Sequence, residues 1–174
     1  SLNRPVYSTE VLLQNSIGQI ENFLSPDTEE MQFLVSNSRV LEEKMLNAES
    51  HLLRRGIVHM DIWFDNLNIS DTDEIIIFDF DFCGNGWLCL DIAYYILQLH
   101  NTEKDDTQRA VKEEAFYKGY ESVLLINDTE KRLIPILAGD APLIDAAGKL
   151  INCVLGIKDC WVTAACSVCS PTPR

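Results

Sequence analysis

Five polar residues in the middle of the chain stand in an order that suits phosphoryl transfer. His59, Asp61 and Asn66 form the pattern H-x-D-x4-N, and an apolar run then ends in Asp79 and Asp81 as D-F-D. Transfer of a phosphoryl group needs a carboxylate that orients the attacking hydroxyl or accepts its proton. It also needs a second carboxylate and an amide oxygen to bind the Mg²⁺ that neutralises the phosphates. The residue types and their order therefore indicate phosphoryl-transfer chemistry.

A short hairpin is the element that would bring these residues together. Residues 67–69 and 75–78 are β-rich runs, and the polar residues 70–73 between them are typical of a turn. The loop before this hairpin carries Asp61, and the end of its second strand carries Asp79. We therefore expect both carboxylates to lie at one end of the hairpin.

Helical periodicity precedes the hairpin. Ser8 can cap a first helix, whose apolar positions recur at helical spacing as Leu13, Ile17, Ile20 and Leu24. Ser25, followed by Pro26 and Asp27, is a second start signal. The apolar stripe of that second helix continues to Leu52, and Gly56 can end it.

Helical periodicity also follows the hairpin. Residues 90–99 predict a mostly buried helix, and residues 128–130 begin a further short one. Residues 107–126 predict an amphipathic helix whose inward positions are Phe116, Tyr120, Val123 and Leu124. The fold class is therefore α+β, mainly α-helical, with a small β-hairpin at the active site.

Composition and charge limit the classes of function. The 174 residues carry a formal net charge of -13, which argues against binding nucleic acid through its phosphates. The charge is compatible with a cationic small substrate, although solubility alone also accounts for it. No apolar run is long enough to span a bilayer, and the N-terminus shows no signal-peptide pattern, so we expect a cytoplasmic protein with no membrane partner.

The cysteines predict neither a disulfide framework nor a metal centre. In a cytosolic chain we expect reduced thiols at all six positions, namely Cys83, Cys89, Cys153, Cys160, Cys166 and Cys169. The last two form a lone C-x-x-C, and a zinc site would need a second pair at similar spacing.

The ordered motifs resemble a known family. H-x-D-x4-N, then I-x-D-F-D, then D-I-A beginning at Asp91 look like the aminoglycoside phosphotransferase and choline kinase superfamily, which is distantly similar to protein kinases. The resemblance is strongest over residues 57–93 and extends over about residues 8–137. It implies ATP as co-substrate, Mg²⁺ as cofactor, and a small hydroxylated acceptor.

The resemblance also implies a role for each residue. Asp61 matches the catalytic base, while Asn66 and Asp79 match the metal ligands. His59 and Asp91 match residues that brace the catalytic loop. Asp81 lies where several relatives have a second acid. We read Asp91 as a helix cap and brace, and the aromatic residues nearby as packing groups, namely Trp63, Phe64, Trp87 and Tyr94.

The resemblance implies a division of the chain as well. Residues 1–137 correspond to the C-terminal lobe of a protein-kinase-like fold, with a catalytic loop at 57–69 and a metal-binding segment at 75–86. Residues 138–174 form a tail that is rich in Ala, Gly and Cys and does not resemble the family's usual ending.

The chain departs from the family pattern in several places. Met60 stands where many aminoglycoside phosphotransferases have Gly, and Trp63 replaces the Lys of Ser/Thr protein kinases, which favours a small-molecule kinase. Only Gly18 and Gly56 precede the motif, and Lys44 is the only lysine before it. We therefore expect the N-terminal lobe, with its Gly-rich loop and phosphate-binding lysine, to be missing from this chain.

Two other functions remain open. The run that ends in Asp79 and Asp81 also looks like the first motif of haloacid-dehalogenase-type phosphatases, where the first Asp is the nucleophile. Cys83 stands where that family has Thr or Val, and His59 and Asp61 would have no role. The other alternative is a non-catalytic kinase-like binding module, which a missing lobe would favour.

Overall fold

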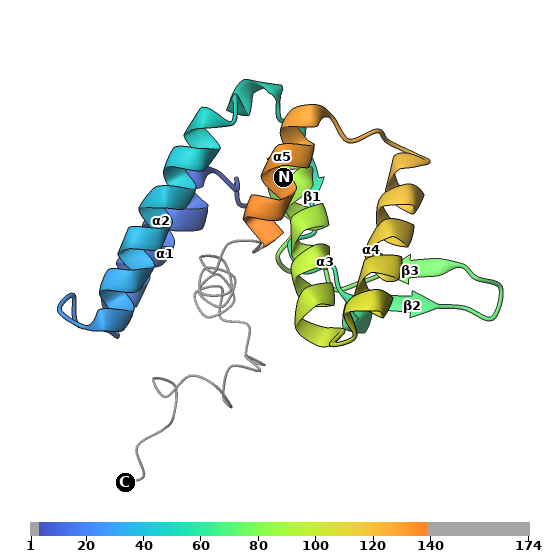
Figure 1. Cartoon of the computed structure of the whole chain (residues 1–174), viewed down its shortest axis with the longest axis horizontal. Coiled ribbons are helices and arrows are strands. Elements are labelled where there is room, and N and C mark those ends of the chain that lie inside the picture. The colour runs from blue at the N-terminus through green and yellow to red at the C-terminus, as the bar shows by residue number, and fades with distance from the viewer. Residues whose placement is uncertain (1–3, 139–174) are drawn as a thin grey trace, which may run out of the picture.

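The computed structural model describes residues 4–138, most of which are helical (Figure 1). A π-helical stretch, Glu10–Gln14, leads into α1 (Asn15–Ile20), and α2 (Glu29–Asn47) follows it. Three helices follow the strands, namely α3 (Cys89–Thr102), α4 (Asp106–Glu121) and α5 (Asp128–Ala138). The mainly helical α+β fold class is thus confirmed. None of the helices within residues 4–138 combines the length and the apolar character needed to cross a bilayer.

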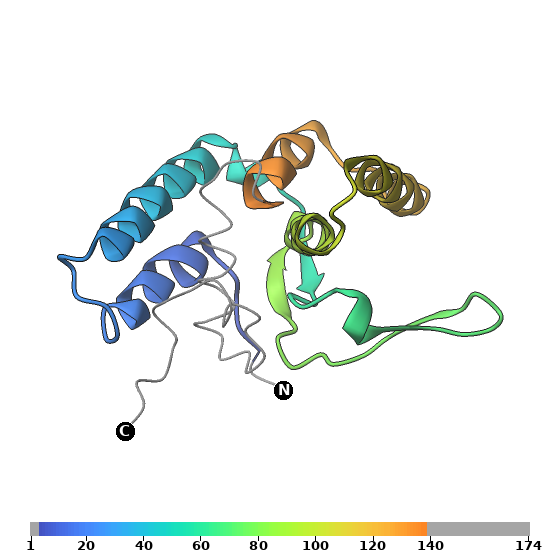
Figure 2. The same ribbon diagram turned by 60° about the horizontal axis from the view of Figure 1, so that its bottom comes forward.

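Two small antiparallel sheets lie between α2 and α3 in the sequence. The expected hairpin is present, with β2 (Leu67–Ile69) paired to β3 (Ile75–Ile77). The second sheet pairs β1 (Arg55–Val58) with β4 (Gly84–Trp87). In Figure 2, α4 and α5 lie on one side of α3 and the strands on the other. The loop between β1 and β2 connects the two sheets, because β1 belongs to one sheet and β2 to the other.

A short N-terminal segment runs beside β4. The backbone N–H of Tyr7 donates to Asn85, and the N–H of Asn85 donates to Pro5, with N···O distances of 2.7 and 2.9 Å. This approach requires Gly84, since a Cβ there would lie 2.7 Å from the Pro5 carbonyl oxygen. The segment thereby pairs with the first residues of β4.

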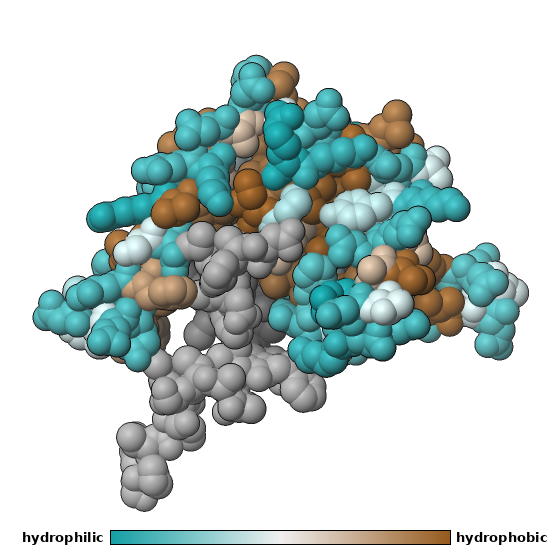
Figure 3. Space-filling model, viewed as in Figure 1, coloured by the Kyte–Doolittle hydropathy of each residue, from teal (hydrophilic) through white to brown (hydrophobic). Residues whose placement is uncertain are grey.

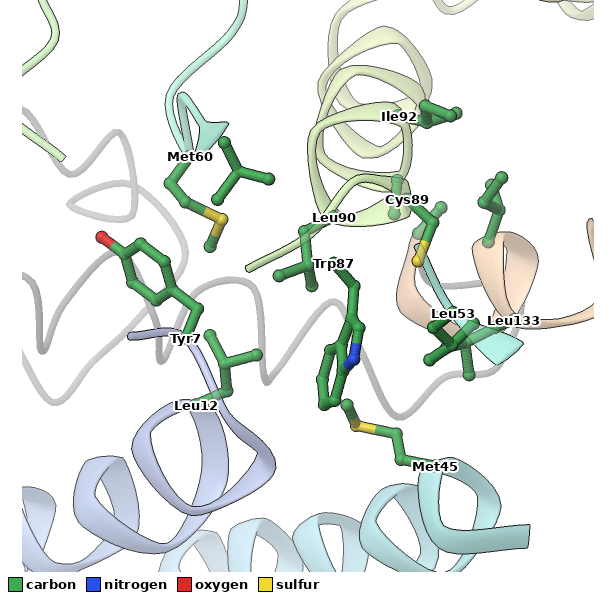
Figure 4. Close-up of a cluster of buried hydrophobic side chains, with 14 of the residues drawn as sticks. Tyr7, Leu12, Met45, Leu53, Met60, Trp87, Cys89, Leu90, Ile92 and Leu133 are labelled. Atoms are coloured by element: carbon green, nitrogen blue, oxygen red, sulfur yellow. The ribbon is translucent and has the colours of Figure 1, made fainter. Parts of the chain in front are cut away.

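One buried cluster joins most parts of the described chain, but not the β2–β3 hairpin (Figure 4). Its side chains come from residues 7–13, from α2, from β1 and β4, and from α3 and α5. Among its members are Tyr7, Leu12, Met45, Leu53, Met60, Trp87, Leu90, Ile92 and Leu133. Trp87 is 3% exposed, which agrees with its expected packing role.

The start of α2 differs from the expectation. Thr28, and not Ser25, is the capping residue, because its hydroxyl accepts a hydrogen bond from the Met31 backbone N–H at 3.3 Å. The Ser25 carbonyl accepts from the backbone N–H of Thr28, so residues 25–28 form a turn before the helix.

The end of α2 also differs. The helix ends at Asn47, and the left-handed residue that follows is Glu49, with φ 50°. Gly56 instead lies in β1, where it pairs with Gly86. The chain leaves the helix at Ala48 and Glu49, so the end of the predicted apolar stripe falls in a 3₁₀ turn, Ser50–Leu52.

The last two inward positions predicted for residues 107–126 are wrong. α4 ends at Glu121, and beyond it Val123 and Leu124 are 88% and 41% exposed. Phe116 and Tyr120 do pack against the buried cluster. The short helix expected at residue 128 is present as α5, which ends at Ala138. The rest of the tail, with Cys153, Cys160, Cys166 and Cys169, lies outside the described residues.

The hairpin exposes apolar side chains. Ile69, Ile75 and Ile76 are each more than half exposed, and Ile77 is 40% exposed. Figure 3 shows hydrophobic surface over the hairpin strands, and hydrophilic surface at the turn that joins them. The strands are therefore held mainly by their own pairing and by the adjoining loops.

Candidate active site

The loop between β1 and β2 carries the H-x-D-x4-N motif. His59, Met60 and Asp61 follow β1 directly and are all buried. The loop then turns through a 3₁₀ helix, Phe64–Asn66, and continues as β2. This turn returns the chain toward Asp61, so Asn66 and Asp61 come into contact.

Asp61 and Asn66 are joined through side chains. The Asn66 Nδ2 donates to the Asp61 backbone carbonyl at 2.9 Å and to Asp61 Oδ2 at 2.8 Å. Both residues are buried, at 8% and 7% exposure. Because Nδ2 makes both bonds, Oδ1 is the atom of the amide that is left to bind another group.

Tyr94 holds the other carboxylate oxygen of Asp61. Its hydroxyl donates to Asp61 Oδ1 at 2.7 Å. Burial, and then the hydrogen bond with Asp61, raise the pKa of Tyr94, so the phenol keeps its proton and acts as a donor. Both carboxylate oxygens of Asp61 therefore accept a hydrogen bond from the protein.

Asp91 holds the backbone of the same loop. Its two carboxylate oxygens accept from the backbone N–H groups of His59 and Met60, each at 2.8 Å. Burial raises the pKa of Asp91, and these two hydrogen bonds partly offset the effect. Asp91 is the third residue of α3, and the capping position is Leu88, so the expected helix cap is wrong.

Met60 adopts a strained backbone conformation between these contacts. Its φ is 64°, in the left-handed region that favours glycine. The Met60 side chain is only 5% exposed and lies beside Tyr7 in the core (Figure 4). The buried side chain and the Asp91 hydrogen bond together hold a conformation that Gly would adopt at lower cost.

His59 connects the loop to the D-F-D segment. Its Nε2 lies 3.0 Å from the Phe78 carbonyl oxygen, and its ring packs 4.8 Å from the Phe80 ring. A carbonyl can only accept, so the Nε2 atom of His59 carries the proton. Its buried Nδ1 has no hydrogen-bond partner among the described residues.

Asp79 lies beside the loop, whereas the side chain of Asp81 does not contact it. The Phe78 backbone N–H donates to the Asn66 carbonyl at 3.2 Å, so the residue before Asp79 is tied to the loop. Asp79 has φ 63° and is exposed. Asp81 is exposed too, and among residues 4–138 its one hydrogen-bond partner is the Arg4 guanidinium, which donates to the Asp81 backbone carbonyl at 3.0 Å.

The available donors suit Mg²⁺ better than a metal held by protein ligands alone. Within residues 4–138, no three His, Cys, Asp or Glu side chains gather closely enough to bind a metal ion. Mg²⁺ keeps several waters and usually takes one or two carboxylates together with substrate phosphates. Asn66 Oδ1 and the exposed Asp79 carboxylate fit that requirement, so these two residues would hold the ion.

The sequence interpretation missed the contacts of three residues around the site, namely Tyr94, Arg4 and Tyr7. Tyr94 was expected to pack, and instead its hydroxyl contacts Asp61. The D-I-A-Y spacing could have revealed this, because Asp91 and Tyr94 are three residues apart and share a helix face. Arg4 and Tyr7 bond the carbonyls of residues 80–82, and no motif pointed to them.

Comparison with known proteins places the chain among phosphate-transferring enzymes. Residues 26–126 match the family described as APH, phosphotransferase enzyme family. The chain is 28% identical over 141 residues to an uncharacterized protein of Synechocystis sp., covering 81% of this chain and 38% of that protein.

Two homoserine kinases are similar over shorter regions. The chain is 37% identical over 89 residues to that of Gluconacetobacter diazotrophicus, which covers 51% of this chain and 27% of the kinase. It is 33% identical over 100 residues to that of Xanthobacter autotrophicus, covering 58% and 31%. The chain thus spans well under half the length of these relatives. No solved structure matches it significantly.

Proposed function

We propose that this chain, which belongs to the phosphotransferase enzyme family, carries the catalytic loop of an ATP-dependent small-molecule kinase in residues 57–91. The observation that carries the proposal is the buried pair of Asp61 and Asn66, whose side chains are hydrogen-bonded at 2.8 Å. A carboxylate fixed in this way beside a free amide oxygen provides both a proton acceptor and a metal ligand.

Asp61 is the residue we propose to handle the proton. An acceptor hydroxyl would donate to a free lone pair of the Asp61 carboxylate while its oxygen attacks the γ-phosphorus of ATP. A new P–O bond forms, the bond to the β-phosphate oxygen breaks, and ADP leaves with that electron pair. The hydroxyl proton passes to Asp61. Bound Mg²⁺ would supply positive charge that stabilises the phosphates.

The remaining predicted residues would support this loop. His59 and Asp91 would brace its backbone through the contacts with Phe78 and with two N–H groups. Asp79 would bind Mg²⁺ together with Asn66. For Asp81 we retain only the proposal of a second acid near the phosphates, since its exposed carboxylate faces no partner within the described residues.

The acceptor that we propose to test first is homoserine. Two of the similar proteins are homoserine kinases, and homoserine offers a primary hydroxyl together with an ammonium group. Homoserine also carries a carboxylate and is a zwitterion, so the net charge of -13 favours it less than it favours the cationic choline or an aminoglycoside. Choline, an aminoglycoside and a neutral sugar are the comparison acceptors.

We expect the 174-residue chain alone to bind ATP weakly and to turn over slowly. Residues 1–58 contain two glycines, Gly18 and Gly56, and one lysine, Lys44. None of them forms a Gly-rich phosphate loop, and Lys44 lies in α2. Loss of even one well-placed donor to a transition state costs about a hundredfold to a thousandfold in rate.

The test compares Asp61→Asn with Asp65→Asn. Asp65 lies in the same loop and is exposed, so its substitution controls for loop charge. Transfer of labelled phosphate from ATP to homoserine should fall by about a hundredfold or more in Asp61→Asn and stay nearly unchanged in Asp65→Asn. Equal effects of the two substitutions would contradict the role of Asp61.

Metal binding gives a second readout that does not depend on turnover. Mn²⁺ in place of Mg²⁺ broadens the NMR signals of nearby nuclei, and with ADP present it should broaden those of residues 66 and 79. Asn66→Ala should weaken this broadening. A phospho-aspartate trapped at Asp79 would instead favour the phosphatase alternative, which leaves the contacts of Asp61 without a role.

A further inference from the structure

The first two turns of α3 contact three consecutive residues of the catalytic loop. Asp91 binds the backbone N–H groups of His59 and Met60, and Tyr94 binds the side chain of Asp61. Asp91 and Tyr94 are three residues apart, so their side chains leave the same face of the helix. One helical face thus controls both the path of the loop and the orientation of its carboxylate.

The Asp61 carboxylate is fixed from two directions. Asn66 Nδ2 binds Oδ2 at 2.8 Å, and the Tyr94 hydroxyl binds Oδ1 at 2.7 Å. A single bond would leave the side chain free to rotate about its Cα–Cβ and Cβ–Cγ bonds. Two bonds to opposite oxygens fix the plane of the group, and each oxygen keeps lone pairs for an acceptor hydroxyl.

A tyrosine at this position has an advantage over a charged donor. Its phenol stays protonated, as the raised pKa of Tyr94 indicates, and it donates without neutralising the carboxylate. A lysine or arginine would pair with Asp61 and lower its basicity. The tyrosine ring is anchored in α3, whose neighbouring residues Ile92, Ala93 and Ile96 are buried.

We propose that Tyr94 is a positioning residue, which fixes the Asp61 carboxylate in the orientation that accepts the proton of the acceptor hydroxyl. This inference rests on the proposed function. Misplacement of a reacting group by about 1 Å can cost about a hundredfold in rate. Loss of the Tyr94 hydroxyl therefore lowers turnover without removing any group that touches ATP or the acceptor.

The experiment compares Tyr94→Phe with Tyr95→Phe. Tyr95 is the next residue of α3, and its ring stacks on Phe116 with centroids 4.0 Å apart. Both substitutions remove one hydroxyl and keep the ring, but only Tyr94 contacts Asp61. For phosphorylation of homoserine by ATP, Tyr94→Phe should lower kcat by about tenfold to a hundredfold, with both KM values within about twofold. Tyr95→Phe should leave kcat nearly unchanged.

A structural readout separates this inference from the proposed function. The side-chain conformation of Asp61 can be measured from three-bond scalar couplings in NMR spectra of each full-length variant. The wild-type chain and Tyr95→Phe should show one Asp61 rotamer, and Tyr94→Phe should show averaging over several. A single unchanged rotamer in Tyr94→Phe overturns the inference, even if the wild-type chain turns over.

Failure of the Tyr94 inference can therefore be distinguished from failure of the proposed function. If the wild-type chain phosphorylates no acceptor and Mn²⁺ with ADP broadens the signals of neither residue 66 nor residue 79, the proposed function fails, and the rotamer measurement alone decides whether Tyr94 positions Asp61. If the wild-type chain is active but Tyr94→Phe keeps its kcat, positioning by Tyr94 is refuted while the proposed function stands.

Discussion

Asp91→Ala should destabilise the protein through the catalytic loop. The substitution removes the acceptor of two buried backbone N–H groups, those of His59 and Met60. A buried group left without a partner costs about 1–3 kcal/mol, so the two together cost about 2–6 kcal/mol. Alanine offers no replacement acceptor, and both N–H groups are too deep for easy hydration.

Two effects reduce this cost. Removal of Asp91 recovers the free energy spent in burying a carboxylate, which is the cause of its raised pKa. A loosened loop also relieves the left-handed Met60, worth about 1–2 kcal/mol. The net loss in the free energy of unfolding should therefore be about 1–4 kcal/mol. With a slope of about 2 kcal/mol per M in urea, the unfolding midpoint falls by about 0.5–2 M.

The assay is urea unfolding followed by circular dichroism, with Asp106→Ala as the matched control. Asp106 also lies in the first turn of a helix, α4, but its side chain is 87% exposed and pairs only with Arg109. Its interaction with the helix dipole is therefore similar, and the loop contacts are absent. The reasoning is refuted if Asp91→Ala lowers the midpoint no more than Asp106→Ala does.

Three further outcomes follow from local geometry. Met60→Gly should be more stable to urea than Met60→Ala by about 1 kcal/mol, since both lose the buried side chain but only Gly relieves the φ of 64°; equal stabilities would contradict this. Burial raises the pKa of Cys89 to about 12, so iodoacetamide at about pH 8 should label partly exposed Cys83 and spare Cys89 until urea is added, as peptide-resolved mass spectrometry can check. Burial alone would raise the pKa of Glu130, but the hydrogen bonds from Arg54 and from backbone N–H groups lower it below its ordinary value of 4.5. Glu130→Gln should therefore cost about 1–3 kcal/mol at neutral pH, and the difference from wild type should shrink as the pH falls below about 4.5; a difference that grows in acid would contradict the sign.

The sequence predicted the hairpin and the helices that follow it, because their signals are local. Two short β-rich runs and the polar turn between them are enough to predict β2 and β3, and the apolar residues 90–99 predict α3. The sheet between β1 and β4 could not be predicted in this way. Its strands are short, are rich in glycine and pair Arg55 with Trp87 across about thirty residues of chain.

The site was predictable where residue type and spacing define the chemistry. Asp61 and Asn66 were expected together, and the structure joins their side chains. Tyr94 was misjudged because an aromatic residue on a buried helix is usually a packing residue. Only the three-dimensional path of the loop shows that its hydroxyl reaches a carboxylate. The chemical roles of all the predicted site residues stay predictions, and among the described residues no side-chain contact joins Asp79 or Asp81 to Asp61.

The fixed spacing of the H-x-D-x4-N motif follows from how this loop closes. The residue before the 3₁₀ turn, Trp63, is extended, and its carbonyl accepts the backbone N–H of Asn66 at 3.0 Å. This bond reverses the chain, so that the Asn66 amide reaches both the backbone carbonyl and the carboxylate of Asp61. One residue more or fewer would move Nδ2 away from at least one of these acceptors. Because those two bonds engage Nδ2, they also determine which atom of Asn66 is free, and Oδ1 is the atom that a metal ion requires.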